Sequence, residues 1–100
     1  MPLVSAEVPQ VSAEEGQQLV EDGALLLDVR EADEWDAGHA PAAVWIPMGD
    51  LQARVAELPR DRRIVAICRT GARSGAVAGA LIGAGYDAVN LDGGMRAWAG

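Results

Sequence analysis

The sequence predicts an α/β layer fold with a mostly parallel sheet, and three observations support this prediction. Short apolar runs without polar alternation recur along the chain, as in strands that are buried on both faces of a sheet. Segments with helical features separate these runs, so that strands and helices alternate. The 100 residues suffice for one modest core and are too few for two, so we expect a single domain over residues 1–100.

The first half of the chain contains one expected helix and several strand candidates. Ser12 and Glu15 form a capping-box pattern, which predicts a helix over about 12–21. Asp22-Gly23 then ends this helix. The apolar runs of this half predict strands at 24–29, at 43–46 and, more weakly, near Glu7-Val8.

The second half continues the alternation. A helix is expected over 50–58, because Leu51, Val55 and Leu58 fall on one helical face. A further helix is expected over 72–84, and apolar runs predict strands at 64–67 and 88–91.

Three glycines, Gly75, Gly79 and Gly83, fall on one face of the helix expected over 72–84. Each costs about 1 kcal/mol relative to alanine in a helix interior. We interpret this face as a place where the helix backbone packs closely against the sheet.

Charge is unevenly distributed along this acidic chain, whose net charge is −7. Residues 1–50 carry eleven Asp and Glu against one Arg, whereas residues 51–100 carry seven Arg against four Asp and Glu. Five of these arginines lie within fourteen positions around Cys68, which favours a small anionic ligand there. Nucleic acid is not an expected partner, because the chain has no extended basic stripe.

Neither a membrane span nor a secretory signal is indicated. The uncharged stretch 74–86 is rich in glycine and shorter than the roughly 20 apolar residues of a membrane helix. Residues 1–10 contain no positive charge and no apolar run of signal-peptide type. We therefore expect a cytoplasmic protein.

Cys68 is the only cysteine, and His39 is the only histidine, so that no metal or cofactor is expected. The cysteine follows one expected strand and precedes a helix, which places it at the carboxyl edge of the sheet, where α/β folds bind ligands. The backbone N–H groups of residues 69–74 can curl inward there, and the helix adds its positive end. These donors, with Arg69 and Arg73, predict a Cys68 pKa below the ~8.5 of a free cysteine. Sulfur, phosphate and redox chemistry all remain open at this point, as does an inert core cysteine.

Three separated segments resemble the signatures of the rhodanese family, and together the resemblance covers about residues 12–100. Leu27-Asp28-Val29-Arg30-Glu31, with Glu34 and Gly38 to Ala43, resembles the first signature. The run from Cys68 to Ser74 resembles the active loop, and 90–95 with Trp98 resembles the closing signature. Ala40, Ala42 and Trp45 depart from the family pattern, which affects a turn rather than the chemistry.

The resemblance implies a rhodanese-like three-layer fold, with a five-stranded, mostly parallel sheet flanked by helices. It also implies a thiosulfate sulfurtransferase that moves sulfane sulfur from thiosulfate or a similar small anionic donor, through a Cys68 persulfide, to cyanide, a thiol or a partner protein. We expect a monomer or weak homodimer. The implied substrate-binding residues are Arg69, Thr70, Gly71, Ala72 and Arg73, and the residues expected to support the site are Asp28, Arg30 and Ser74. For Asp28, Arg30 and His39 we favour a structural role, through a charge pair or backbone hydrogen bonds, over a catalytic one.

Two alternative functions belong to other classes. A related phosphatase and arsenate reductase arrangement places one residue more between its cysteine and arginine than the four between Cys68 and Arg73, so the narrower loop here favours a single sulfur atom. A non-enzymatic module could instead bind a partner or sense oxidants through Cys68, although no second cysteine is present to resolve a sulfenic acid. The acidic stretch of Glu31, Asp33, Glu34 and Asp36 is interpreted as a solvated helix end or loop.

Overall fold

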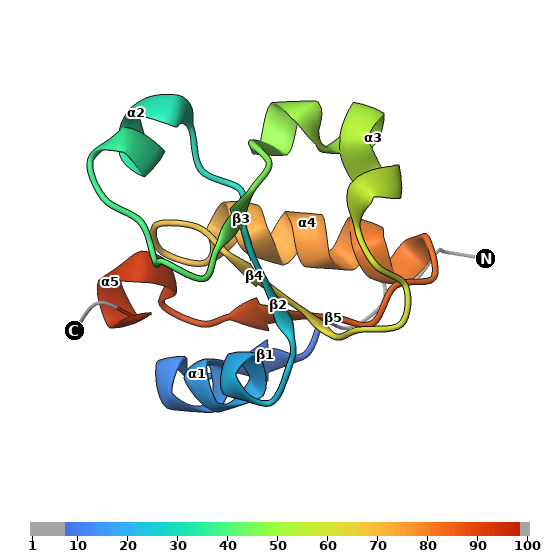
Figure 1. Cartoon of the computed structure of the whole chain (residues 1–100), viewed down its shortest axis with the longest axis horizontal. Helices are drawn as coiled ribbons and strands as arrows, with labels where there is room; N and C mark the ends of the chain where they lie inside the picture. The colour runs from blue at the N-terminus through green and yellow to red at the C-terminus, as the bar shows by residue number, and fades with distance from the viewer. Residues whose placement is uncertain (1–7, 99–100) are drawn as a thin grey trace.

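The computed structural model describes residues 8–98 and contains a five-stranded sheet in which every paired strand is parallel (Figure 1). The strand order is β1-β5-β4-β2-β3. This arrangement confirms the predicted α/β class and sharpens "mostly parallel" to entirely parallel. The strands are β1 (Gln10–Val11), β2 (Leu25–Asp28), β3 (Val44–Trp45), β4 (Ile64–Ile67) and β5 (Ala88–Leu91).

Helices cover both faces of the sheet and complete three layers. In Figure 1, α1 and α5 lie below the sheet, while α3 and α4 lie above it. The α-helices are α1 (Ala13–Glu21), α2 (Ala32–Asp36), α3 (Leu51–Arg54), α4 (Ala72–Gly83) and α5 (Gly94–Trp98), and two 3₁₀ helices, η1 (Met48–Asp50) and η2 (Val55–Glu57), flank α3.

The three central strands β2, β4 and β5 are buried on both sides, as their continuous apolar runs predict, whereas the edge strands β1 and β3 are partly exposed. Successive side chains of a strand point to opposite faces, so Leu25 and Leu27 of β2 join the core beneath α3 and α4, while Leu26 joins the core against α1 and α5. Cys68 belongs to the α4 side of the sheet.

The capping box predicted for the first helix is present. Ser12 accepts from the backbone N–H of Glu15, at 3.0 Å, and its own N–H donates to the Glu15 carboxylate, at 2.9 Å. The helix ends at Glu21 with Asp22 as its C-cap, and Gly23 adopts a φ of 110°, which glycine tolerates. The helix expected over about 12–21 is therefore α1, with Ser12 as its N-cap.

Two expectations about element boundaries are wrong in detail. The first strand lies at 10–11 rather than near Glu7-Val8; Glu7 is outside the described residues, and Pro9, which has no N–H to donate, precedes the strand. The segment 50–58 is not one helix but the short helices η1, α3 and η2 in succession. Pro59 forces extended backbone on the residue before it, and Leu58 is indeed extended.

The glycine face of α4 is only partly explained by close packing. A Cβ on Gly75 would stand 3.4 Å from the Asn90 side chain of β5, and one on Gly79 would stand 3.4 Å from Val8. Gly83 has no neighbour within 4 Å of such a Cβ, so the packing interpretation is wrong for that position.

Candidate active site

Cys68 lies directly after β4, at the carboxyl edge of the sheet, and α4 begins four residues later. Gly71 precedes the helix with a φ of 110°, a left-handed conformation that turns the chain back over the cysteine. The loop therefore wraps Cys68 instead of leading away from it, and the cysteine is only 1% exposed.

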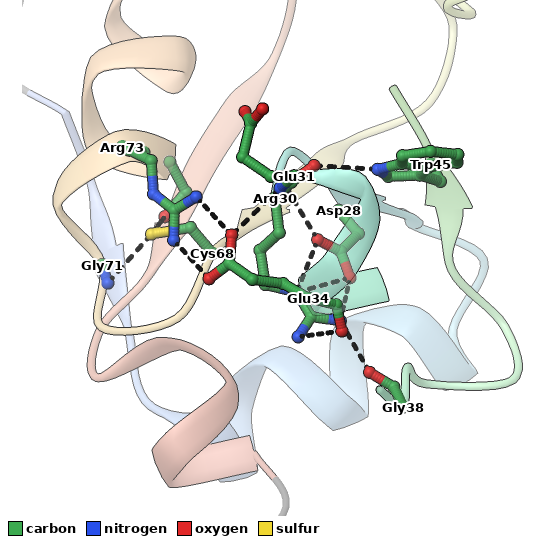
Figure 2. Close-up of polar contacts among 10 residues, drawn as sticks. Asp28, Arg30, Glu31, Glu34, Gly38, Trp45, Cys68, Gly71 and Arg73 are labelled. Carbon is green, nitrogen blue, oxygen red and sulfur yellow. Dashed lines mark hydrogen bonds and ion pairs between the residues drawn. The ribbon is translucent and has the colours of Figure 1, made fainter. Parts of the chain in front are cut away.

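Two hydrogen-bond donors meet at the cysteine sulfur. The backbone N–H of Gly71 donates to Cys68 Sγ at 3.1 Å, as Figure 2 shows, and the Ser74 hydroxyl lies 3.2 Å from the same atom. Burial acts to raise the pKa of Cys68, but the Ser74 hydroxyl and the N–H groups of Ser74, Gly71 and Thr70 outweigh it, and the pKa of Cys68 is lowered. The lowered pKa is the direction that the sequence predicts.

Arg73, which the sequence predicts as a donor-binding residue, is paired with a side chain of another element. Its two terminal nitrogens donate to both carboxylate oxygens of Glu34 in α2, at 2.7 and 2.8 Å (Figure 2). This pairing lowers the pKa of Glu34 to about 2, chiefly through the hydrogen bonds from Arg73, and raises that of Arg73. Glu34 and the Arg73 guanidinium form a bidentate ion pair, so Arg73 connects the active loop to α2.

The other loop residues form an exposed rim. Arg69, Thr70 and Ala72 are exposed, and within residues 8–98 no ion pair of Arg69 is found. Arg69 is thus the loop's accessible positive charge.

Three of the arginines near Cys68 in the sequence lie at the other end of β4, so the expected anion-binding cluster is smaller than the sequence suggests. Arg60 stacks over Tyr86, Arg62 donates to the Gly23 carbonyl, and Arg63 pairs with Asp87. Closeness in the sequence did not predict closeness in space, because Arg60, Arg62 and Arg63 precede the strand and Cys68 follows it.

Asp28 and Arg30 form the charge pair expected after the second strand. Asp28 is fully buried, Arg30 is 6% exposed, and their closest contact is 2.7 Å. Arg30 also donates to the carbonyls of Glu34 and Gly38, at 3.3 and 2.9 Å. The pair therefore holds the middle of α2 and the turn that follows it, and through Glu34 it is connected to the active loop (Figure 2).

An aromatic stack lies beside this pair. The His39 ring stacks on Trp35 with centroids 3.5 Å apart, and Trp35 stacks on Trp45 at 5.4 Å. His39 Nδ1 lies 2.9 Å from the Trp35 carbonyl, which fits the structural, hydrogen-bonded role expected for this residue. Trp45 donates its indole N–H to the Arg30 carbonyl, which is how this departure from the family pattern is accommodated.

Two features that support the loop, the start of α5 and the side chain of Asn90, were not predicted from the sequence. The N–H groups of Met95 and Arg96, in α5, donate to the carbonyls of Cys68 and Arg69, at 2.7 and 3.2 Å. Gly94 begins this helix at a φ of 58°, and a Cβ there would overlap both carbonyls. No periodicity reveals so short a helix.

Asn90 of β5 is the second missed group. It bonds to Ser74 and Gly71 from behind the loop, and it is 4% exposed. A polar residue inside an otherwise apolar buried strand was the available signal, because buried polar groups require partners.

Neither a metal-binding group nor a membrane-spanning helix is found among residues 8–98. No group of three or more His, Cys, Asp or Glu side chains among residues 8–98 is placed to hold a metal ion. None of the helices in these residues has the length and apolar character needed to cross a membrane.

Comparison with known proteins gives consistent matches over nearly the whole chain. The model of the rhodanese-like domain matches residues 12–100. A putative sulfurtransferase of Bacillus subtilis, YtwF, is 38% identical over 96 residues, which cover 94% of this chain and 93% of that protein. The thiosulfate sulfurtransferase GlpE of Pseudomonas savastanoi pv. phaseolicola is 32% identical over 93 residues, covering 92% of this chain and 88% of that protein.

Solved structures of rhodanese-related proteins superpose on this chain over most of its length. A rhodanese-related protein from Thermoplasma volcanium superposes with a TM-score of 0.85 at 28% identity, covering 91% of this chain and 90% of that one. A rhodanese homologue from Thermus thermophilus superposes with a TM-score of 0.76 at 36% identity, covering 90% of this chain and 100% of that one.

Proposed function

The chain belongs to the rhodanese-like sulfurtransferase family, and from this premise we propose that it moves sulfane sulfur from thiosulfate or a similar anionic donor to a thiophilic acceptor, through a persulfide on Cys68. The observation that carries the proposal is the environment of Cys68 Sγ. Hydrogen bonds from Gly71 and Ser74 favour its thiolate, which is the nucleophilic form of cysteine.

In the first half-reaction the Cys68 thiolate attacks the outer sulfur of thiosulfate. A bond forms between Sγ and that sulfur, the sulfur–sulfur bond of thiosulfate breaks, and its electron pair leaves with sulfite. Cys68 then carries one additional sulfur, which bears the negative charge. Inward-facing N–H groups of the loop stabilise this charged sulfur.

In the second half-reaction an acceptor takes the outer sulfur. Cyanide or a thiolate attacks it, the bond to Sγ breaks, and its electron pair returns to Sγ as the thiolate. Thiocyanate is the product with cyanide, and a new persulfide is the product with a thiol, whether that thiol is small or belongs to a partner protein.

We assign contact with the donor to the exposed rim, Arg69 to Ala72, rather than to Arg73. Arg69 is the accessible guanidinium of the loop, whereas Arg73 is held by Glu34. In this assignment Arg73 keeps the loop in place against α2, and Asp28 with Arg30 keeps α2 in place.

Mass spectrometry of the intact protein after treatment with thiosulfate tests the proposal. We expect the wild-type chain to gain one sulfur atom on Cys68 and to lose it when cyanide is added, with thiocyanate released. Cys68→Ser should neither gain sulfur nor form thiocyanate, because an alcohol at this position is not ionised.

A wild-type protein that gains no sulfur from thiosulfate or from a low-molecular-weight persulfide would contradict the proposal and favour the partner-binding or redox-sensing alternative. Hydrolysis of an aryl phosphate faster than sulfur transfer would favour the phosphatase alternative. Circular dichroism of Cys68→Ser confirms that its loss of activity is chemical and not a loss of fold.

A further inference from the structure

Asn90 lies behind the active loop and makes three polar contacts there. Its Oδ1 is 2.6 Å from Ser74 Oγ, while its Nδ2 donates to the Gly71 carbonyl at 3.1 Å and to Gln10 Oε1 at 2.9 Å. It is 4% exposed and makes no hydrogen bond to Cys68 Sγ. Asn90 therefore acts on the sulfur only through its neighbours.

The orientation of the Asn90 amide follows from these contacts. The Gly71 carbonyl and Gln10 Oε1 are the acceptors near one end of the amide, so that end must be the NH₂ group. Oδ1 then faces Ser74, and because a carbonyl oxygen can only accept, the hydrogen between them comes from the Ser74 hydroxyl.

Ser74 consequently has one hydroxyl proton and two possible acceptors. Asn90 Oδ1 lies 2.6 Å away and Cys68 Sγ lies 3.2 Å away. A hydroxyl carries a single donor, so a proton directed at one acceptor leaves the other without it.

The charge on the sulfur decides which acceptor receives this proton. When Cys68 is a thiol, its S–H can donate to Ser74 Oγ while the hydroxyl donates to Asn90, and every group has a partner. When Cys68 is a thiolate, the charged sulfur attracts the hydroxyl proton, and Asn90 Oδ1 is left 2.6 Å from an oxygen lone pair. Ionisation therefore costs the hydrogen bond to Asn90.

We propose that Asn90 is a positioning residue that holds the Ser74 hydroxyl proton away from Cys68 whenever the sulfur is uncharged, and so limits how strongly Ser74 favours the thiolate. The loop itself is not expected to depend on Asn90, because the Gly71 carbonyl also accepts from the N–H of Gly75, at 3.0 Å. The influence of Asn90 on the sulfur thus runs through Ser74.

This inference rests on the proposed function only where it concerns the persulfide. In the persulfide the charge lies on the outer sulfur, and Sγ is a neutral, weak acceptor, so the Ser74 proton returns to Asn90. Release of the outer sulfur restores charge to Sγ and breaks the bond to Asn90 again. Asn90 therefore favours the loaded form over its discharge.

The test is the pH dependence of Cys68 alkylation by iodoacetamide, which reads the thiolate directly and needs no sulfur transfer. Four proteins are compared: wild type, Asn90→Leu, Ser74→Ala and the double variant. We expect Asn90→Leu to raise the alkylation rate about 3- to 10-fold at a pH below the wild-type midpoint, the size of effect expected for one exchanged hydrogen bond. Ser74→Ala should lower the rate, because a donor to the thiolate is lost.

The double variant tests whether Asn90 affects the sulfur through Ser74. In the Ser74→Ala background, replacement of Asn90 should change the alkylation rate less than 2-fold, because no shared hydroxyl proton remains. Gln10→Ala is the matched control, since it removes a contact of Asn90 but keeps both the Gly71 contact and the bond to Ser74. It should behave as wild type.

The charged side chains on elements around Cys68 are unchanged in all of these proteins, so they cancel in the comparison. They are Arg73 on α4, whose charge interacts with Cys68; Glu31 and Glu34 at α2; the pair of Asp28 and Arg30 at the end of β2; Arg69 in the loop; Asp92 before α5; and Arg96 in α5.

An unchanged or slower alkylation of Asn90→Leu, or an equal acceleration in the Ser74→Ala background, would overturn the inference. If Asn90→Leu does not fold, as judged by circular dichroism, Asn90→Ala serves in its place, because it removes the same oxygen and leaves space instead of filling it. If the wild-type protein transfers no sulfur while the alkylation rates of the four proteins differ as expected, the result counts against the proposed function and leaves this inference intact.

Discussion

Glu34 connects two parts of the site that are 39 positions apart in the sequence, through its ion pair with Arg73. The same carboxylate accepts from the backbone N–H of Glu31 and so also completes the capping box of α2. A single side chain thus stabilises both the start of a helix and the position of the active loop.

The pH dependence of stability should report this pair. Because the pKa of Glu34 is lowered to about 2 from its ordinary value of 4.5, its contribution is fully present above that ordinary value and is lost as the pH falls from about 4.5 towards 2. We expect wild type to exceed Glu34→Gln by about 1 kcal/mol in free energy of unfolding at pH 6. Glutamine preserves the capping pattern, so the comparison removes mainly the charge.

Urea unfolding at pH 6 and at pH 2.5 measures the difference. The gap between the two proteins should narrow at the lower pH, where Glu34 becomes partly protonated. A gap that stays constant between the two pH values would show that the charge of Glu34 does not provide the stabilisation.

For individual residues, the sequence predicts Cys68 as the candidate nucleophile and a lowered pKa for its thiol. It does not predict the partner of Arg73. The lowered pKa follows from groups within six residues of Cys68, all visible in one motif. The ion pair depends on where α2 is placed in space, and no spacing along the chain contains that information.

Among the elements, α5 has the closest relation to the loop. Gly94 has a φ of 58°, which L side chains rarely adopt, and its Cα faces the carbonyls of Cys68 and Arg69. We expect Gly94→Ala to lower the free energy of unfolding by more than about 2 kcal/mol, from backbone strain and overlap together.

Gly83 provides the matched control for this substitution. It lies at the end of α4 with no neighbour within 4 Å of a Cβ, so Gly83→Ala should raise the free energy of unfolding by roughly 0.5–1 kcal/mol. Urea denaturation of both variants distinguishes the two effects. A Gly94→Ala protein as stable as wild type would contradict the role assigned to α5.

Elements with a clear periodicity or cap could be predicted, and the shortest ones could not. The helix over 12–21 and the strands over 64–67 and 88–91 matched because a capping box and buried apolar runs define them locally. The five-residue helices α2 and α5 give too short a window for any period, and they are held by contacts with Arg30 and with the loop carbonyls.

Across the whole molecule, β4 separates the five arginines of residues 60–73 into two groups. The four residues of this strand span about 13 Å. This exceeds the Debye length of roughly 8 Å at physiological ionic strength, beyond which salt largely screens the interaction of exposed charges. Arg69 therefore acts at the sulfur site, while Arg62 at the opposite edge does not. The topology, rather than the sequence distance to Cys68, decides which charge an anionic donor meets.

Steady-state kinetics with thiosulfate and cyanide test this separation. Arg69→Gln should raise the KM for thiosulfate about 3- to 10-fold with little change in kcat, since it removes a charge that binds the donor. Arg62→Gln should leave both constants within 2-fold of wild type. Equal effects of the two substitutions would mean that the donor responds to net charge and not to the rim of the loop.

The contacts of α5 also bear on how the site is made during synthesis. A nascent chain emerges from the ribosome with Cys68 ahead of Gly94 and Met95, so the carbonyls of Cys68 and Arg69 have no partners in α5 until that later segment is released. The strand before the cysteine can pair with β2 earlier, because β2 precedes it in the chain. Cys68 is thus translated well before the loop around it can form all its contacts. The loop reaches its final structure only when α5 has left the ribosome.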